Sequence, residues 1–142
     1  MLPGVDTALA SRADRRLHAK QEIWITTVRS DGQPQASPVG FLWDGDTVLI
    51  MSQPGSQKVR NLRANPRVAL HLDIDRQADR DNGIVTLEGV AALDSQPIST
   101  AETTRYLEKY ADLLASLEMT ADELLAEYST VIRVRPTRAR VY

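Results

Sequence analysis

The chain has 142 residues, and its shares of hydrophobic residues (42 %) and charged residues (25 %) are typical of an ordinary globular protein. Its 17 basic and 19 acidic residues give a formal net charge of −2, which argues against a protein that binds nucleic acid through bulk positive charge. The absence of cysteine excludes thiolate chemistry, and with only two histidines, His18 and His71, no bound metal ion is expected.

The first predicted element is a helix from Asp6 to Lys20, which Asp6 or Thr7 can cap. An apolar stripe recurs along it at helical spacing, formed by Leu9, Ala10, Ala13 and Leu17. Three arginines fall mostly outside that stripe, so we expect them on a solvated face; they are Arg12, Arg15 and Arg16.

Three β-strands are predicted next, separated by Asp-Gly turn signals. The segment Glu22–Val28 is rich in β-branched and aromatic residues. Gln35–Trp43 contains Pro38 and Gly40, so this second strand is expected at an edge, bulged or interrupted. Thr47–Ser52 is the third strand. Two successive hairpins predict an antiparallel meander.

A short helix over Gln57–Ala64 is predicted to follow, because Ser56 can cap it and Pro66 can end it. Beyond it we expect a strand over Arg67–Ile74, a polar loop over Arg76–Asn82 and a long strand over Gly83–Leu93 with a bulge or bend at Gly89.

The C-terminal third predicts two helices, one from Ser99 or Thr100 to Leu117 and one from Thr120 to Tyr128. A strand over Ser129–Arg135 follows, and residues 136–142 add another. Six or seven strands with short flanking helices predict a single α+β domain over residues 1–142, mainly antiparallel. Closing the sheet into a small barrel would remove its exposed edges.

No segment approaches the roughly 20 apolar residues that cross a bilayer. The N-terminal stretch also lacks the apolar core of a signal peptide. We therefore expect a cytoplasmic protein without membrane insertion.

The clearest chemical pattern lies in residues 51–62, where a strand end, a glycine-containing loop and a helix start follow one another. The unpaired N–H groups of a helix N-terminus favour an anion. Ser52 and Ser56 add hydroxyl donors, and Lys58 and Arg60 add positive charge. The segment predicts a phosphate site, the alternative being a plain loop before a capped and solvated helix.

A second candidate is Ser37-Pro38-Val39-Gly40, where small residues and the missing proline N–H would let a flat ligand approach the backbone. The alternative is a kinked edge strand. His71 is expected on a solvated or partner-facing side of its strand. Four aromatic residues are expected in the core or an interface: Trp24, Trp43, Tyr106 and Tyr110. No nucleophilic triad or nucleotide-binding glycine motif is present, so a cofactor would carry the chemistry of an enzyme.

The order of these segments resembles the pyridoxamine 5′-phosphate oxidase-like family, whose FMN-binding-like fold is a split β-barrel. The resemblance rests on TVLIMS at a strand end, SQKVRNL at a helix start and NPRVAL on the next strand, and it spans Ile23 to Tyr142. It is greatest to small actinobacterial members that use the deazaflavin coenzyme F420, the flavin/deazaflavin oxidoreductase B group. It implies a homodimer with cofactor sites in the subunit interface and a small-molecule substrate.

The resemblance also implies cofactor contacts. Residues 37–39 match the strand that passes the isoalloxazine-like ring, residues 51–52 the strand end beside the phosphate, and Lys58 the phosphate-binding lysine. Residues 60–61 match positions that serve the phosphate or the cofactor side chain. Gln57 stands where FMN-using members have arginine, and this loss of a bidentate donor favours F420 over FMN. The expected cofactor-binding residues are Ser37, Pro38, Val39, Met51, Ser52, Ser56, Gln57, Lys58, Arg60 and Asn61.

The implied reaction is hydride transfer from reduced F420 to a small unsaturated or quinone-like acceptor, with no catalytic side chain assigned. The alternatives are an FMN-dependent oxidase or reductase and a non-catalytic F420- or flavin-binding carrier. Haem binding, known among relatives of the fold, would need His18 or His71 as axial ligand. A nucleic-acid-binding barrel would need exposed stacking aromatics, and aromatic residues are only 5 % of the chain.

Overall fold

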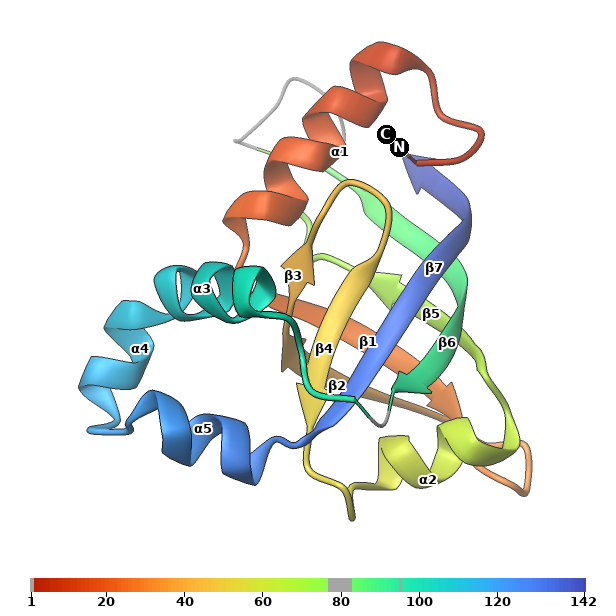
Figure 1. The fold of residues 1–142 in the computed structure, drawn as a ribbon. Coiled ribbons are helices and arrows are strands. Elements are labelled where there is room, and N and C mark those ends of the chain that lie inside the picture. The colour runs from red at the N-terminus through yellow and green to blue at the C-terminus, as the bar shows by residue number, and fades with distance from the viewer. Residues whose placement is uncertain (1, 77–82, 95) are drawn as a thin grey trace.

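The computed structural model describes residues 2–76, 83–94 and 96–142, and in these residues seven strands form one sheet. The strand order is β2-β1-β5-β6-β7-β4-β3, and neighbouring strands are antiparallel (Figure 1). This arrangement confirms the predicted mainly antiparallel α+β class. The strands are β1 (Glu22–Val28), β2 (Pro34–Gly40), β3 (Leu42–Trp43), β4 (Val48–Ser52), β5 (Arg67–His71), β6 (Val85–Asp94) and β7 (Thr130–Val141).

The strands β2 and β3 are separated only by Phe41, yet they occupy opposite ends of the sheet. The sheet therefore curls until its ends approach each other, and Figure 1 shows it as a barrel. The single strand predicted over residues 35–43 is broken at Phe41. The predicted meander is wrong, because the β1–β2 and β3–β4 hairpins form at opposite ends of the sheet order. The Phe41 ring is fully buried, and its N–H donates to the Tyr110 hydroxyl at 2.8 Å.

Apolar side chains from alternate strand positions fill the barrel. On β1, Ile23 and Ile25 are fully buried, while Trp24 between them is only half-buried. Two helices, α1 (Thr7–Ala19) and α2 (Gln57–Ala64), lie at opposite ends of the barrel (Figure 1). Each contributes a fully buried side chain to the same core, Leu17 and Val59. Burial of such a side chain stabilises the fold by about 1.5–3 kcal/mol, which holds both helices on the sheet.

One arginine of α1 departs from the expected solvated face. Arg16 is buried, and its Nη2 donates to the Asp73 carbonyl at 2.9 Å, in the segment after β5. The expectation was wrong because helical spacing marks the apolar stripe but not the backbone carbonyls that a neighbouring segment offers to a long side chain.

Three further helices stand outside the barrel: α3 (Thr100–Lys109), α4 (Ala111–Ser116) and α5 (Ala121–Glu127) (Figure 1). The helix predicted up to Leu117 is therefore two helices, which separate at Tyr110. The Tyr110 hydroxyl donates to the Gln21 carbonyl at 2.5 Å, just before β1. This bond and the bond from Phe41 fix the helical segment to the barrel. The helices enclose a second apolar cluster whose buried members are Met51, Tyr106, Tyr110 and Leu124.

The C-terminal strand β7 is continuous where two strands were predicted. Pro136 lies opposite Gly89, where the register of β6 and β7 shifts, so the predicted bulge at Gly89 is confirmed. A Cβ on Gly89 would lie 2.6 Å from the Arg135 carbonyl oxygen, and that close approach requires glycine. The strand β5 ends at His71, before the predicted Ile74, and the predicted polar loop beyond Arg76 lies outside the described residues. None of the helices in the described ranges is long and apolar enough to cross a membrane.

Candidate functional site

The barrel is open between β2 and β4. In the described part of the chain β2 pairs only with β1, and β4 pairs with β3 only through Val48 and Leu49. The free edge of β2 and the edge of β4 beyond Leu49 approach each other without pairing. We call this opening the seam. Unpaired strand edges present backbone N–H and C=O groups, so the seam offers hydrogen-bonding groups to a ligand.

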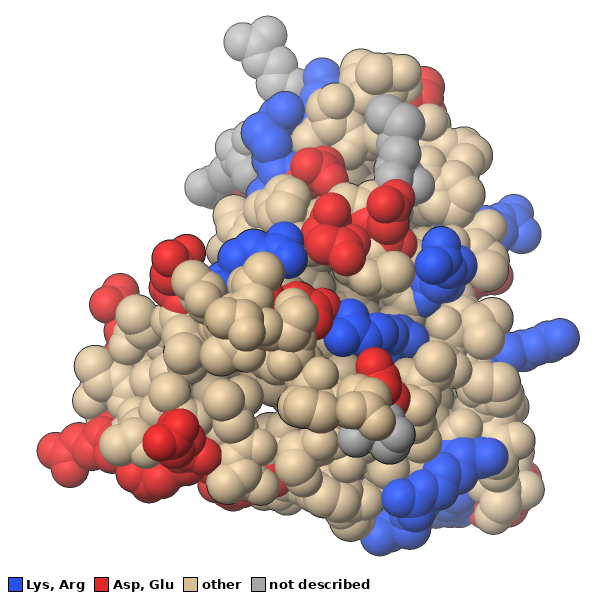
Figure 2. All heavy atoms as spheres, in the orientation of Figure 1, with Lys and Arg blue, Asp and Glu red and all other residues tan. Residues whose placement is uncertain are grey.

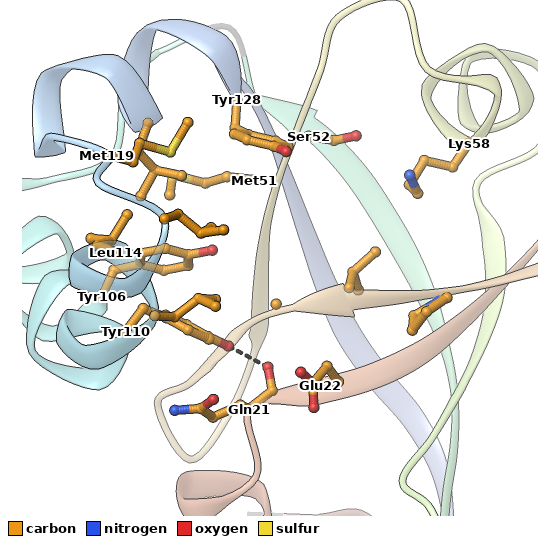
Figure 3. Close-up of a pocket in the computed structure, with 16 residues that line it drawn as sticks. Gln21, Glu22, Met51, Ser52, Lys58, Tyr106, Tyr110, Leu114, Met119 and Tyr128 are labelled. Atoms are coloured by element: carbon orange, nitrogen blue, oxygen red, sulfur yellow. Dashed lines mark hydrogen bonds between the residues drawn. The ribbon is translucent and has the colours of Figure 1, made fainter.

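A pocket of about 320 Å³ lies at the seam (Figure 3). Pockets of this size hold small molecules. Strands β2 and β4 contribute to it, α2 contributes on one side, and the helical segment from α3 to Tyr128 contributes on the other. The lining residues are Gln21, Glu22, Pro38, Val39, Gly40, Met51, Ser52, Lys58, Tyr106, Tyr110, Leu113, Leu114, Leu117, Met119, Leu124 and Tyr128.

The first wall of the pocket comes from the start of α2. Ser56 caps the helix, since its hydroxyl accepts a hydrogen bond from the Val59 N–H at 3.4 Å, and it lies 3.0 Å from the Ser52 hydroxyl. Lys58, in the first turn, extends its ammonium group into the pocket (Figure 3). The start of α2 thus carries two serine hydroxyls and, in its first turn, a cation, and such a helix N-terminus favours an anion.

The Lys58 ammonium has no counterion in the described residues, and none of them accepts a hydrogen bond from it. The side chain is half-buried, and desolvation lowers the pKa of Lys58. A bound anion would offset that desolvation by pairing with the charged form. The donors present therefore fit a phosphate group.

The opposite wall is formed by three tyrosines, Tyr106, Tyr110 and Tyr128, which we call the tyrosine wall. The rings of Tyr106 and Tyr110 are 4.7 Å apart. Within the described residues, the hydroxyls of Tyr106 and Tyr128 have no hydrogen-bond partner, whereas that of Tyr110 is bonded to the barrel backbone. Burial, with a smaller effect of Tyr128, raises the pKa of Tyr106 to about 12, so this phenol keeps its proton at neutral pH.

The rim beside the tyrosine wall is apolar and open to solvent. Leu117 is 62 % exposed and Leu113 is 43 % exposed, and both line the pocket. Exposed leucines beside a pocket are a feature of surfaces that bind apolar ligands or partners.

Five of the ten predicted cofactor-binding residues line the pocket: Pro38, Val39, Met51, Ser52 and Lys58. Ser56 borders it through its contact with Ser52. Ser37 lies one position away on β2, where it is half-buried opposite Ile25 on β1.

The other three, Gln57, Arg60 and Asn61, form a hydrogen-bonded network on α2 outside the pocket. The buried Asn61 amide donates to the Thr27 hydroxyl and to the Gln35 side-chain oxygen, each at 2.9 Å. The Gln57 amide donates to Asn61 at 2.8 Å, and the Arg60 guanidinium donates to the Gln57 oxygen at 2.6 Å. This network ties α2 to β1 and β2 and thereby fixes the position of Lys58.

The tyrosine wall is the part of the pocket that the sequence pattern did not assign to a ligand. Tyr106 and Tyr110 are four residues apart, a spacing equally expected of core residues on a helix. The break of the helix at Tyr110 turns the following leucines toward the seam, and no local signal marks that break.

His71 lies on the outer side of the sheet, away from the pocket. Its ring stacks on Trp24 with centroids 6.1 Å apart, and the Trp24 indole N–H donates to Asp73 at 3.1 Å. His18 is exposed on α1. Neither histidine lines the pocket, and no cluster of three potential metal ligands occurs within the described ranges.

Charge is distributed unequally around the pocket. Figure 2 shows Lys and Arg side chains gathered where α2 lies, and Asp and Glu side chains gathered around α4 and α5. The exposed members on and after α2 are Arg60, Arg63 and Arg67. The exposed acidic residues in and around α4 and α5 are Asp112, Glu118, Asp122, Glu123 and Glu127. An anionic ligand would therefore be oriented with its charge toward α2.

The model of the pyridoxamine 5′-phosphate oxidase family matches residues 10–142. A search of curated proteins finds no match. An F420 reductase of known structure is 27 % identical, with 89 % of this chain and 94 % of that chain covered and a TM-score of 0.66.

Two further solved structures share the fold. A putative pyridoxamine 5′-phosphate oxidase from Listeria innocua is 22 % identical over 94 % of this chain and 97 % of that chain, with a TM-score of 0.68. The heme storage protein HutZ from Vibrio cholerae is 17 % identical over 92 % of this chain and 91 % of that chain, with a TM-score of 0.67. The expected split β-barrel is thus confirmed, and proteins named for different functions share this fold.

Proposed function

The chain belongs to the pyridoxamine 5′-phosphate oxidase family, and from this premise we propose that it is an F420-dependent oxidoreductase that reduces a small organic acceptor in the pocket at the seam. The observation that carries the proposal is Lys58, a half-buried cation without a counterion in the described residues, beside two serine hydroxyls at the start of α2. This is the donor set that a phosphate-bearing cofactor needs.

The residues of the pocket fit such a cofactor. Lys58 and Ser52 would hold its phosphate, and the free edge of β2 at residues 38–40 would lie along its ring. When bound, the deazaflavin supplies hydride chemistry, which none of the side chains lining the pocket provides. The protein would contribute by holding the ring against β2 and by orienting the acceptor beside the ring. The helical segment from α3 to Tyr128 would exclude water.

Two observations favour F420 over FMN. Gln57 replaces the arginine of FMN-using members, and its amide is engaged with Asn61 and Arg60 instead of facing the pocket. The exposed basic residues on and after α2 also suit a cofactor with an extended anionic tail, and Arg63 and Arg67 are the candidates there. The 27 % identity to an F420 reductase supports the same choice.

The proposal includes a homodimer with the pocket at or near the interface. It is supported by the exposed leucines Leu113 and Leu117 at the rim, which a second copy would shield from water. Sedimentation velocity measures the oligomeric state directly, and a monomer at all concentrations would remove this part of the proposal.

The test is a titration of the purified protein with F420 and, separately, with FMN, followed by cofactor fluorescence. We expect F420 to bind, Lys58→Ala to weaken binding about 10- to 100-fold, and Lys58→Arg to weaken it less. Arg29→Ala is the matched control, because Arg29 is exposed and pairs with Asp31 in the β1–β2 turn outside the pocket. It should change F420 binding by less than about twofold.

Each other outcome has a definite meaning. If FMN binds and F420 does not, the protein is an FMN-dependent oxidase or reductase and not an F420-dependent one. Binding of F420 without turnover of any acceptor would identify a carrier. Binding of neither cofactor would overturn the proposed function.

A further inference from the structure

The three lysines of the chain lie in three different environments. Lys20 is paired with Asp75 at 2.8 Å, and Lys109 donates to the Phe41 carbonyl at 2.9 Å. Lys58 lines the pocket at the seam and, across the residues that the structure describes, has neither a counterion nor a hydrogen-bond acceptor. Among the three, the nitrogen of Lys58 is therefore the one that can react with a molecule in the pocket.

The environment of Lys58 also favours the reactive form of its amine. Only the neutral amine has a lone pair with which to attack an electrophile. Desolvation of the half-buried side chain lowers the pKa of Lys58. In the described part of the chain no carboxylate opposes this effect, whereas Glu22 opposes it at Lys109. At neutral pH a larger fraction of Lys58 is therefore neutral than of a lysine on an open surface.

The same pocket offers hydrogen-bond donors for a phosphate group. Ser52 lines the pocket, and its hydroxyl lies 3.0 Å from that of Ser56, the N-cap of α2. The first turn of a helix leaves backbone N–H groups without partners in the helix, and these favour an anion. Lys58 is the second residue of that turn. A phosphate bound there would hold any group attached to it beside the Lys58 amine.

We propose that Lys58 is a modification site for acyl phosphates, whose phosphate binds at the start of α2 while the acyl group is transferred to the Lys58 nitrogen. A molecule held beside a nucleophile reacts at an effective concentration far above its concentration in solution. Acylation converts the cation into a neutral amide. The consequence for the cofactor rests on the proposed function, because the loss of this charge would prevent the binding of a phosphate-bearing cofactor.

The transfer needs no reactant besides the acyl phosphate. The neutral amine attacks the carbonyl carbon, a C–N bond forms, and the C–O bond to the phosphate breaks. Inorganic phosphate leaves, and the nitrogen gives its surplus proton to water or to the departing phosphate. No atom is oxidised or reduced. The donors that bind the phosphate also stabilise the negative charge that develops on it as it leaves.

The experiment treats the purified protein, without cofactor, with acetyl phosphate and follows the acetylation of each lysine by peptide mass spectrometry. Lys20 and Lys109 are internal references. Lys109 is the more stringent one, because burial lowers its pKa to about 8 while its nitrogen is bonded to the Phe41 carbonyl and does not line the pocket. The comparison reagent is the N-hydroxysuccinimide ester of acetic acid, which transfers the same acyl group and carries no phosphate.

We expect acetyl phosphate to modify Lys58 at least about tenfold faster than Lys20 or Lys109, and the succinimide ester to show a preference below about threefold. Inorganic phosphate should slow the reaction of Lys58 with acetyl phosphate more strongly than its reaction with the ester. Ser52→Ala should lower the rate with acetyl phosphate about threefold to tenfold. The matched control is Ser11→Ala, in an exposed serine of α1 outside the pocket, which should leave the rate unchanged.

Three results would each overturn the inference. The first is that Lys20 or Lys109 reacts with acetyl phosphate as fast as Lys58. The second is an equal preference for Lys58 with both reagents, since Lys58 would then be merely accessible. The third is that neither inorganic phosphate nor Ser52→Ala slows the reaction of Lys58 with acetyl phosphate.

The consequence for the cofactor is measured separately, by titrating F420 into unmodified protein and into protein acetylated at Lys58. Acetylation should weaken F420 binding about 10- to 100-fold, the loss expected of Lys58→Ala. Equal binding by both proteins would overturn the regulatory part of the inference. Failure of the proposed function is distinguishable, because it would appear as no F420 binding by the unmodified protein and would leave the acetylation rates unaffected.

Discussion

The two walls of the pocket are built in different ways. The wall formed by the start of α2 is polar. The helix is hydrogen-bonded to β1 and β2 through the buried side chain of Asn61. The tyrosine wall stands outside the barrel and is fastened mainly where Tyr110 meets the backbone of Gln21 and Phe41. The helix that forms the first wall packs into the hydrophobic core of the barrel, whereas the tyrosine wall belongs to a second cluster outside the barrel. We therefore expect damage to the first to affect the whole molecule and damage to the second to stay local.

The largest effect is expected from Asn61→Ala. The change removes the hydrogen bonds to the buried Thr27 hydroxyl and to the half-buried Gln35, and the Thr27 hydroxyl loses its donor, which costs about 2–3 kcal/mol. Urea denaturation should show that loss as one cooperative transition. Gln57→Ala, in an exposed residue of the same network, should cost less than about 0.5 kcal/mol. An equal loss in both variants would contradict the central role of Asn61.

A smaller and more local effect is expected from Tyr110→Phe. The ring remains, but the buried Phe41 N–H loses its acceptor, at a cost of about 1–2 kcal/mol. Hydrogen exchange should accelerate in α3–α5 while the barrel strands keep their protection. Tyr106→Phe is the control, because its hydroxyl bonds to none of the described residues and its loss should leave exchange unchanged. Uniform acceleration over the barrel would show that the two walls unfold together.

The smallest effect concerns pH and Lys109, whose ammonium donates to the Phe41 carbonyl and lies 3.8 Å from the Phe41 ring centroid. Burial lowers the pKa of Lys109 to about 8, against an opposing effect of Glu22. Between pH 8 and its ordinary value near 10.5, the unfolded chain binds more protons than the folded one, so stability rises with pH in that window. Since the group is partly solvated, we expect less than about 1 kcal/mol.

The matching measurement is denaturation at pH 7.5 and pH 9.5 for the wild type and Lys109→Met. The variant should lose most of the alkaline gain, and Lys20→Met, at a half-buried pair with Asp75 away from Lys109, should keep it. Both measured pH values lie below 10, where the unfolded tyrosines begin to ionise. Burial raises the pKa of Tyr106 and Tyr110, so those groups lower stability as pH rises above 10.

The contrast between the walls also separates what the sequence could predict from what it could not. Residues 57–64 form a helix with the expected cap at Ser56 and the expected end before Pro66, because caps and prolines act over a few residues. The bulge at Gly89 is local in the same sense.

The breaks at Phe41 and Tyr110 depend on each other across the fold, through one hydrogen bond between residues 69 positions apart. No window of the sequence contains both partners, so the strand and the helix were each predicted as unbroken. The tyrosine wall follows from those breaks. Five of the ten expected cofactor-binding residues line the pocket, whereas Gln57, Arg60 and Asn61 lie outside it although the sequence predicted their helix correctly.

The position of Phe41 has a consequence for the order of events in folding. One residue joins strands that belong to opposite ends of the sheet, so the barrel closes only when segments from residue 22 to residue 141 have all assembled. Such long-range closure is slow and comes late. The pocket lies at that closure, so a ligand has nothing to bind until folding is nearly complete. A bound cofactor should therefore lower the unfolding rate constant and leave the folding rate constant unchanged. The native state would then last longer before it unfolds.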